Sequence, residues 1–193
     1  MTKTITALEQ FFLQSGFLGE GLETILSKFT FKGVQKGDLF LEEGKIVTQL
    51  AFLESGAFHY FYNIEGAIRT TFVHVNNVFM TSMNSFLNSV PNSENIQAIT
   101  NSTIAVIYKN DLMELINKVV GFKDFYIAML EYQVSCLDKG RLDLLVKTPE
   151  ERYLRILKEQ PELFQKVPLK LLAYTLGMTP RHLSRVRKKI IGN

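Results

Sequence analysis

The first part of the chain places apolar residues at a helical spacing. They recur three or four positions apart between Leu8 and Phe12, and again between Leu22 and Leu26, and glycines lie between the two stretches. Such a period is typical of amphipathic helices, and glycine is the residue that most readily breaks them. The pattern predicts two short helices within residues 4–28, joined by a glycine-rich turn.

From Phe29 to about Tyr108 the pattern becomes that of β-strands. Short runs of aromatic and β-branched residues are separated by turns that contain glycine, which supplies the positive φ that tight turns need. Residues 57–62 and 67–75 flank the segment Asn63–Gly66, which we expect to form the tip of a hairpin. Many short strands separated by turns predict a small antiparallel roll or barrel.

A helical spacing returns after Asn110 and Asp111, which we expect to cap a helix. A longer helix is predicted from Phe122 to about Leu145, and at 1.5 Å per residue it would extend roughly 36 Å. Its apolar stripe would either cover the roll or pair with a second copy of the chain as a coiled coil, and we favour pairing. The stripe consists of Phe122, Phe125, Met129, Tyr132 and Cys136.

Thr148 and Pro149 mark the start of a further domain, because threonine is a good N-cap and proline fits the first helical position. Within this domain, residues 169–188 have the residue sizes that a helix-turn-helix requires. Ala173 lies where the two helices would cross, and Gly177 lies where the first helix must end with positive φ. The small core beneath is predicted to contain Leu172, Leu176, Met178, Leu183 and Val186.

Charge is unevenly distributed along the chain. The 22 basic and 19 acidic residues give a net charge of +3. The last acidic residue is Glu162, and the segment that follows it carries +7 while the residues before it carry −4. A basic end on an otherwise acidic chain indicates a polyanionic partner.

The second helix of this basic segment has the features of a DNA-recognition helix. Thr179 is its predicted N-cap, and Leu183 and Val186 would point inward, leaving the basic side chains outside. The first residues of such a helix reach base edges in the major groove, and flanking cations hold phosphates. The sequence therefore predicts double-stranded DNA as a partner. The predicted contact residues are Lys170, Thr179, Arg181, His182, Ser184, Arg185, Lys188 and Lys189.

Residues 37–56 and 149–189 resemble the cyclic-AMP receptor/FNR superfamily of bacterial transcription regulators, and the second stretch is similar to the branch common in Bacteroidetes-type bacteria. The resemblance implies a homodimeric regulator that reads a two-fold-related DNA site, and contact with RNA polymerase if it is an activator. Arg181 and His182 replace an acidic and a small polar residue of that branch, so the base preference is not transferred.

The resemblance also implies an α+β fold. It comprises an N-terminal antiparallel β-roll of the cyclic-nucleotide-binding type, a double-stranded β-helix with flanking helices. A long dimerisation helix and a C-terminal winged helix-turn-helix follow. The implied domains are the sensor roll at residues 1–118, the dimerisation helix at 119–147 and the DNA-binding domain at 148–193.

Cyclic-nucleotide-binding members of that superfamily hold the phosphate with a short helix that opens with Gly-Glu and a nearby arginine. The corresponding residues 78–98 contain no glycine, arginine or lysine, so a buried phosphate would lack its cation. Glu94 would repel an anion if it faced the pocket. We therefore do not expect cyclic AMP to bind. The polar residues of this stretch would either line a pocket for a neutral ligand or form a solvated loop, and we favour the loop. Any small-molecule effector is unidentified.

Two other classes stay open. The first is a metal-dependent enzyme, because small β-rolls resemble cupins, whose histidines and glutamate bind a metal. This chain offers His59, His74 and Glu54 but no His-x-His pair. The second is a ligand sensor or adaptor that does not bind DNA. Metal analysis would identify the enzyme, and a salt-titrated DNA-binding assay would identify the adaptor.

The sequence predicts no enzyme, no catalytic residues, no metal site and no cofactor. The single cysteine, Cys136, rules out an internal disulfide or an iron–sulfur cluster, and we expect it to fill the core. No apolar run reaches the length of a membrane span, and no secretory leader is recognisable. We therefore predict a cytoplasmic protein.

Overall fold

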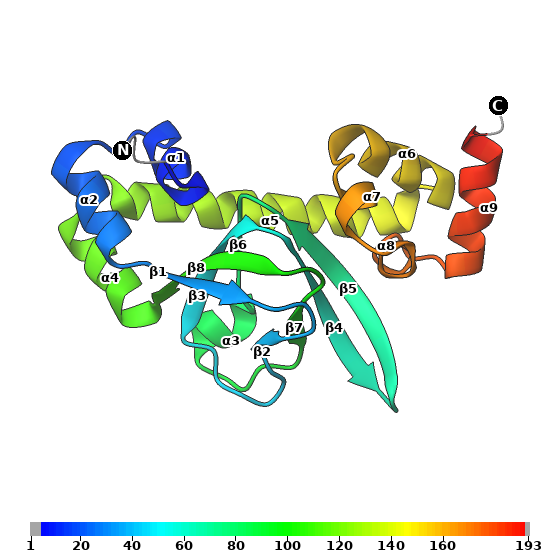
Figure 1. The fold of residues 1–193 in the computed structure, drawn as a ribbon, viewed down its shortest axis with the longest axis horizontal. Coiled ribbons are helices and arrows are strands. Elements are labelled where there is room, and N and C mark those ends of the chain that lie inside the picture. Colours follow the sequence, from blue (N-terminus) through cyan, green and yellow to red (C-terminus); the bar gives the residue numbers. More distant parts are fainter. Residues whose placement is uncertain (1–4, 192–193) are drawn as a thin grey trace.

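The fold is a β-roll with one long helix alongside it and helices at both ends, in a computed structural model that describes residues 5–191. Helix α5 (Phe122–Val146) runs past the roll, with the N-terminal helices at one end and the C-terminal helices at the other (Figure 1). None of the helices in the described residues combines the length and the apolar character that a membrane span needs.

The predicted roll is confirmed as two four-stranded antiparallel sheets. Their strand orders are β1-β8-β3-β6 and β2-β7-β4-β5. The predicted hairpin is also present, because β4 and β5 pair along their whole length. The strands are β1 (Thr30–Val34), β2 (Leu39–Leu41), β3 (Gln49–Ser55), β4 (Ala57–Ile64), β5 (Ala67–Val75), β6 (Val78–Met80), β7 (Asn95–Ala98) and β8 (Ser102–Tyr108).

Two tight turns around β4 explain the positions of its glycines. The β4–β5 turn consists of Glu65 and Gly66 with φ values of 51° and 82°, the pattern of a type I′ hairpin turn. Gly56, between β3 and β4, has φ 111° and lies so close to Ser102 that an added Cβ would overlap the serine side chain. The backbone therefore turns there only because glycine has no side chain.

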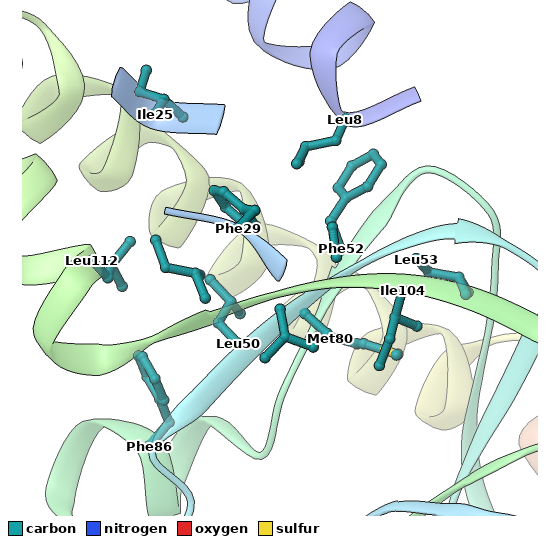
Figure 2. Close-up of a cluster of buried hydrophobic side chains, with 14 of the residues drawn as sticks. Leu8, Ile25, Phe29, Leu50, Phe52, Leu53, Met80, Phe86, Ile104 and Leu112 are labelled. Carbon is teal, nitrogen blue, oxygen red and sulfur yellow. The ribbon is translucent and has the colours of Figure 1, made fainter. Parts of the chain in front are cut away.

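The main core lies between the two sheets and the N-terminal helices. Figure 2 shows Leu8 pointing toward Phe52 of β3, and Ile25 and Leu112 belong to the same cluster, so that helices and strands share one core. The two short helices predicted within residues 4–28 are confirmed as α1 and α2, and together with α4 they cover one end of the roll. The helices involved are α1 (Ala7–Gln14), α2 (Gly19–Ser27) and α4 (Lys109–Lys118).

Two details of the predicted helices are wrong. Helix α4 starts at Lys109 with Tyr108 as its N-cap, because strand β8 runs directly into it. Asp111 therefore lies inside the first turn, where its carboxylate pairs with Lys28 at 3.2 Å. Asn110 is likewise within the helix and does not cap it.

The predicted stripe on α5 has two different environments. Phe122, Phe125 and Met129 pack on the core of the roll. Tyr132 is 71 % exposed and Cys136 is exposed, so neither packs on the core of the roll within one chain. The reason is geometric, since α5 is longer than the surface of the roll that it covers (Figure 1).

The C-terminal region consists of helices, and we call residues 148–191 the reader module. Residues 109–191 contain no strand, so the predicted wing is not present there. The segment between α6 and α8 contains the short helix α7, and the residues after Thr179 form α9. The helices are α6 (Pro149–Glu159), α7 (Leu163–Lys166), α8 (Leu169–Thr175) and α9 (Pro180–Ile191).

Candidate nucleic-acid interface

The turn between α8 and α9 has the geometry that the sequence predicts. Gly177 has φ 66°, and its N–H donates to Tyr174 O at 2.9 Å. The Met178 N–H donates to Ala173 O at 2.9 Å, which completes a Schellman motif and satisfies the last carbonyls of α8. The Thr179 hydroxyl then accepts from the His182 N–H at 3.2 Å, so the predicted N-cap of α9 is confirmed.

The small core predicted between α8 and α9 is confirmed as well. Ala173 is fully buried in one cluster with residues of both α8 and α9. Tyr153 of α6 joins this cluster from below. All five predicted core residues are buried, namely Leu172, Leu176, Met178, Leu183 and Val186.

The reader module packs directly on the roll. Val73 of β5, with Ala57 and Ile99, belongs to the same buried cluster as the core of the module. Helix α8 lies next to the β4–β5 hairpin in Figure 1, and residue contacts between α8 and β5 support this placement. The roll and the module are therefore in direct apolar contact, in addition to their connection through α5.

The outer face of α9 carries most of the predicted contact residues. Leu183 and Val186 are buried and Ile190 packs on the same cluster, so the opposite side of the helix faces away from the module. Ser184 is exposed, but its hydroxyl donates to Pro180 O at 3.0 Å. His182 is half-buried, and the structure places it at the edge of this face. The exposed members are Arg181, Ser184, Arg185, Lys188 and Lys189 on α9, Thr179 at its N-cap, and Lys170 in the first turn of α8.

No carboxylate of the described residues lies within ion-pair distance of Arg181, Arg185, Lys188 or Lys189. Basic side chains elsewhere in the module do have such partners, as Lys166 does with Glu162 at 3.7 Å. The cations of α9 are thus free to meet an anion from solution, and we call Arg181, Arg185, Lys188 and Lys189 the basic face.

A second exposed surface was missed by the sequence analysis. Ile127, Val134 and Leu137 on α5 are 44 %, 65 % and 56 % exposed. With half-buried Leu130 they follow a 3-4-3 spacing, and Leu144, 52 % exposed, continues the same face. We call these five residues the α5 seam. The spacing is visible in the sequence, but the stripe that packs on the roll has the same period and hides it.

Several side chains in and around residues 78–98 are fully buried. Phe58, Met80 and Phe86 are at most 1 % exposed, and Tyr60 is buried next to them. Helix α3 (Met83–Asn88) occupies this stretch. The cation that reaches this helix, Lys109, donates to Phe86 O at 2.6 Å and so binds the carbonyl end of α3.

The expectation of a solvated polar loop in this stretch is right for the exposed side chains of Asn84, Asn88 and Ser89, but other polar side chains are buried. Ser85 is 1 % exposed, because its hydroxyl donates to Val90 O at 2.6 Å and accepts from the Val47 N–H at 2.9 Å. Asn92 is 3 % exposed. These polar groups satisfy the backbone of the roll and leave few donors for a ligand. Glu94 is half-buried, and burial raises the pKa of its carboxyl.

The three residues considered for a cupin-like metal have other roles. The carboxylate of Glu54 accepts from the N–H groups of Ala7 at 2.9 Å and Leu8 at 2.6 Å, which caps α1. No signal in the sequence indicates that cap. Within residues 5–191 there is no group of three metal-binding side chains.

The two histidines of the roll, His59 and His74, have separate sets of contacts. His59 is buried between Thr70 and Gln97, each at 3.1 Å, and burial lowers its pKa. His74 packs against the rings of Tyr60 and Phe72, and burial lowers its pKa to about 4. Both side chains are therefore neutral at pH 7 and serve the packing of the roll.

Comparisons with known proteins agree with this architecture. The family model described as "Cyclic nucleotide-binding domain" matches residues 31–119. No curated protein matches the sequence. Among solved structures, FixK2 from Bradyrhizobium japonicum is similar at 16 % identity over 85 % of each chain, with a TM-score of 0.71.

Two further structures extend the similarity to the C-terminal helices. A CooA mutant from Carboxydothermus hydrogenoformans covers 100 % of this chain and 86 % of its own, with 16 % identity and a TM-score of 0.69. The Thermus thermophilus catabolite activator protein covers 93 % and 86 % respectively, with 21 % identity and a TM-score of 0.57. Residues 31–119 are thus similar to the cyclic nucleotide-binding domain family, and the chain shares its overall fold with these three solved structures.

Proposed function

We propose that this protein is a homodimeric, DNA-binding transcription regulator of the cyclic-AMP receptor/FNR type, acting in the cytoplasm and without catalytic activity. It reads a two-fold-related site through α8 and α9. The basic face carries this proposal, because its four cations project from the side of α9 that is opposite to the buried Leu183 and Val186.

The chemistry of the basic face suits duplex DNA. Arg181 and Arg185 lie one helical turn apart near the start of α9, where a recognition helix meets base edges. A guanidinium can bind guanine O6 and N7 together. Lys188 and Lys189 at the end of the helix, and Lys170 on α8, suit the phosphates on either side, a contribution that weakens with salt.

Dimerisation is proposed to occur through the α5 seam. Apolar side chains at a 3-4-3 spacing form the contact line of a two-stranded coiled coil, and four of the five seam residues are 44–65 % exposed in the single chain. Two α5 helices packed in this way would relate the two reader modules by a two-fold axis. The DNA site would accordingly be two-fold related as well.

The roll is proposed to sense something other than cyclic AMP, or to act as a scaffold. The support is the buried side chains Phe58, Met80 and Phe86 at the cassette and the absence of a cation in residues 78–98. We expect millimolar cyclic AMP to leave the thermal midpoint unchanged. RNA polymerase is a further partner if the regulator activates transcription.

The experiment that tests the function is a DNA-binding assay with the purified protein. Selection from random duplexes should yield an inverted repeat, and binding should weaken as salt is added. Failure to bind duplex DNA even in dilute buffer would contradict the proposal and favour the sensor or adaptor. A tightly held metal ion in each chain would favour the enzyme.

Arg185→Ala is the most informative substitution at the interface. We expect it to lose about 1–3 kcal/mol of discrimination between selected and random DNA, with the dimer intact. Arg69→Ala removes the same charge from an exposed position on β5 and should change neither affinity. An equal loss on selected and random DNA would show that Arg185 contacts phosphate only.

A further inference from the structure

Arg152 of α6 is a buried cation with an unusual set of partners. Its side chain is only 7 % exposed. Its Nε donates to Leu176 O at 2.8 Å, and its Nη1 donates to Lys147 O at 2.6 Å. None of the ion pairs in the described residues includes it. A guanidinium cannot lose its charge in a protein, so these carbonyls must compensate for its burial.

The two carbonyls belong to the C-terminal ends of two different helices. Lys147 is the C-cap of α5, and Leu176 is the C-cap of α8. Carbonyls at such ends lack partners within their helix and carry partial negative charge. The helix ends therefore take the place of a carboxylate. Because the guanidinium is planar and its donors are fixed relative to one another, it also fixes the two helix ends relative to one another.

The turn of the helix-turn-helix lies against the same place. A Cβ added to Gly177 would be 3.2 Å from Leu144 Cδ2 and 3.5 Å from Arg152 Nη2. Leu144 belongs to α5, so the long helix meets the turn directly. Helix α5 is thus connected to the α8–α9 turn in two ways besides the chain itself. One is the pair of hydrogen bonds from Arg152, and the other is the approach of Leu144 to Gly177.

Arg155, one turn further along α6, differs in one respect. Its Nη2 lies 2.8 Å from Asp143 Oδ2, and its Nη1 lies 3.5 Å from Glu159. It therefore joins α6 to α5 but forms no hydrogen bond or ion pair with α8 in the described residues. This makes Arg155 the matched control for a role in holding α8.

We propose that Arg152 is a positioning residue for DNA recognition: it holds the end of α8 to the end of α5, and so sets the orientation of α9 relative to the α5 seam. This inference rests on the proposed function. In a two-fold dimer, the recognition helices must be about 34 Å apart to reach successive major grooves. A change in the angle between α9 and α5 would alter that separation in both subunits at once.

The first test does not need DNA. Cys136 on α5 and Ser184→Cys on α9 are exposed positions for two nitroxide labels, and excess unlabelled protein restricts the measurement to distances within one chain. We expect a narrow distance distribution for the unmodified background and for Arg155→Met. Arg152→Met should broaden and displace the distribution, and Arg152→Lys should restore it in part, because an ammonium can donate to a carbonyl without the fixed geometry of a guanidinium. An unchanged distribution in a folded Arg152→Met variant would overturn the proposal.

The second test compares a duplex that carries the selected two-fold site with one that carries a single half-site. Loss of a charge-assisted contact predicts about a tenfold weaker affinity of Arg152→Met for the two-fold site. The half-site affinity should change little, and Arg155→Met should bind both duplexes nearly as the unmodified protein does. An equal loss on both duplexes would show a merely structural role and would overturn the proposal.

The lysine variant keeps these tests interpretable if Arg152→Met fails to fold. It preserves the charge at the two helix ends and should give a smaller loss in the same direction, restricted to the two-fold site. If the unmodified protein binds no duplex DNA, the proposed function fails, and the label distances then decide separately whether Arg152 positions α9.

Discussion

The β-roll and the reader module differ in what they do with their polar groups. In the roll, Ser85, His59 and Glu54 are each bonded to other parts of the roll or to α1. In the module, the cations of the basic face have no carboxylate partner among the described residues, although the core beneath them is as well buried as that of the roll. The difference teaches that the polar groups of the roll are used to hold its structure together. The charged groups that remain available to a partner lie on α9 instead.

The largest effect is expected where the roll depends on a glycine. Gly56→Ala would place a Cβ against Ser102, with the serine Cα only 2.9 Å away, at a φ of 111°. We expect a loss of more than about 3 kcal/mol in the free energy of unfolding, measured by urea titration. Gly33→Ala in β1 is the control, because its φ is not positive and nothing lies within 4 Å of the added atom. Similar losses in the two variants would contradict the role given to Gly56.

A smaller effect, restricted to acid, is expected from His74. Its pKa is about 4 in the folded protein because of burial, against 6.5 without it. The unfolded chain therefore binds a proton more readily, and the stability that the neutral ring contributes is present above pH 6.5 and is lost as the pH falls towards 4. The difference between the two pKa values corresponds to a loss of at most about 3 kcal/mol in the free energy of unfolding.

The measurement is the difference in unfolding free energy between the unmodified protein and His74→Gln at pH 7 and pH 4.5. The raised pKa of Glu94 acts in the opposite direction, but it is common to both proteins and leaves the comparison valid. We expect the unmodified protein to lose more stability than the variant on acidification. Equal losses would show that His74 is not the group responsible.

The smallest effect is expected at the start of the reader module. Thr148 and Glu151 form a capping box, in which the threonine hydroxyl accepts from the Glu151 N–H at 3.3 Å and the Glu151 carboxylate accepts from the Thr148 N–H at 2.8 Å. Thr148→Ala should lower the local stability of α6 by about 1 kcal/mol. Hydrogen exchange in α6 should therefore be faster than in the unmodified protein, while exchange in the roll stays unchanged. Thr24→Ala, on the exposed face of α2, should leave α6 unchanged. Exchange that accelerates equally in the roll would contradict a local effect.

The features that the sequence predicted well are those set by local chemistry. A helix end with positive φ, an N-cap hydrogen bond and a first helical position each favour a particular residue type. Gly177, Thr179 and Pro149 are of those types, so the local structure can be predicted from them. The hairpin at Glu65 and Gly66 belongs to the same class. Hence the roll, and the turn between α8 and α9, could be predicted from the sequence.

The features that were missed depend on what lies against each face. Whether Cys136 or Leu137 of α5 meets the roll cannot be read from their spacing, because the roll covers only the first part of the helix. In the sequence Arg152 is indistinguishable from a surface arginine of an amphipathic helix. It is buried because the C-terminal ends of α5 and α8 lie beside it and accept its hydrogen bonds. Tertiary contacts of this kind leave no periodic signal.

The most direct test of the central claim, that the basic face of α9 binds duplex DNA, is the salt dependence of affinity. The logarithm of the association constant should fall linearly with the logarithm of salt concentration. Lys188→Ala with Lys189→Ala should reduce that slope by about two for each chain. Binding that is absent at low salt, or a slope that the double variant leaves unchanged, would contradict the account.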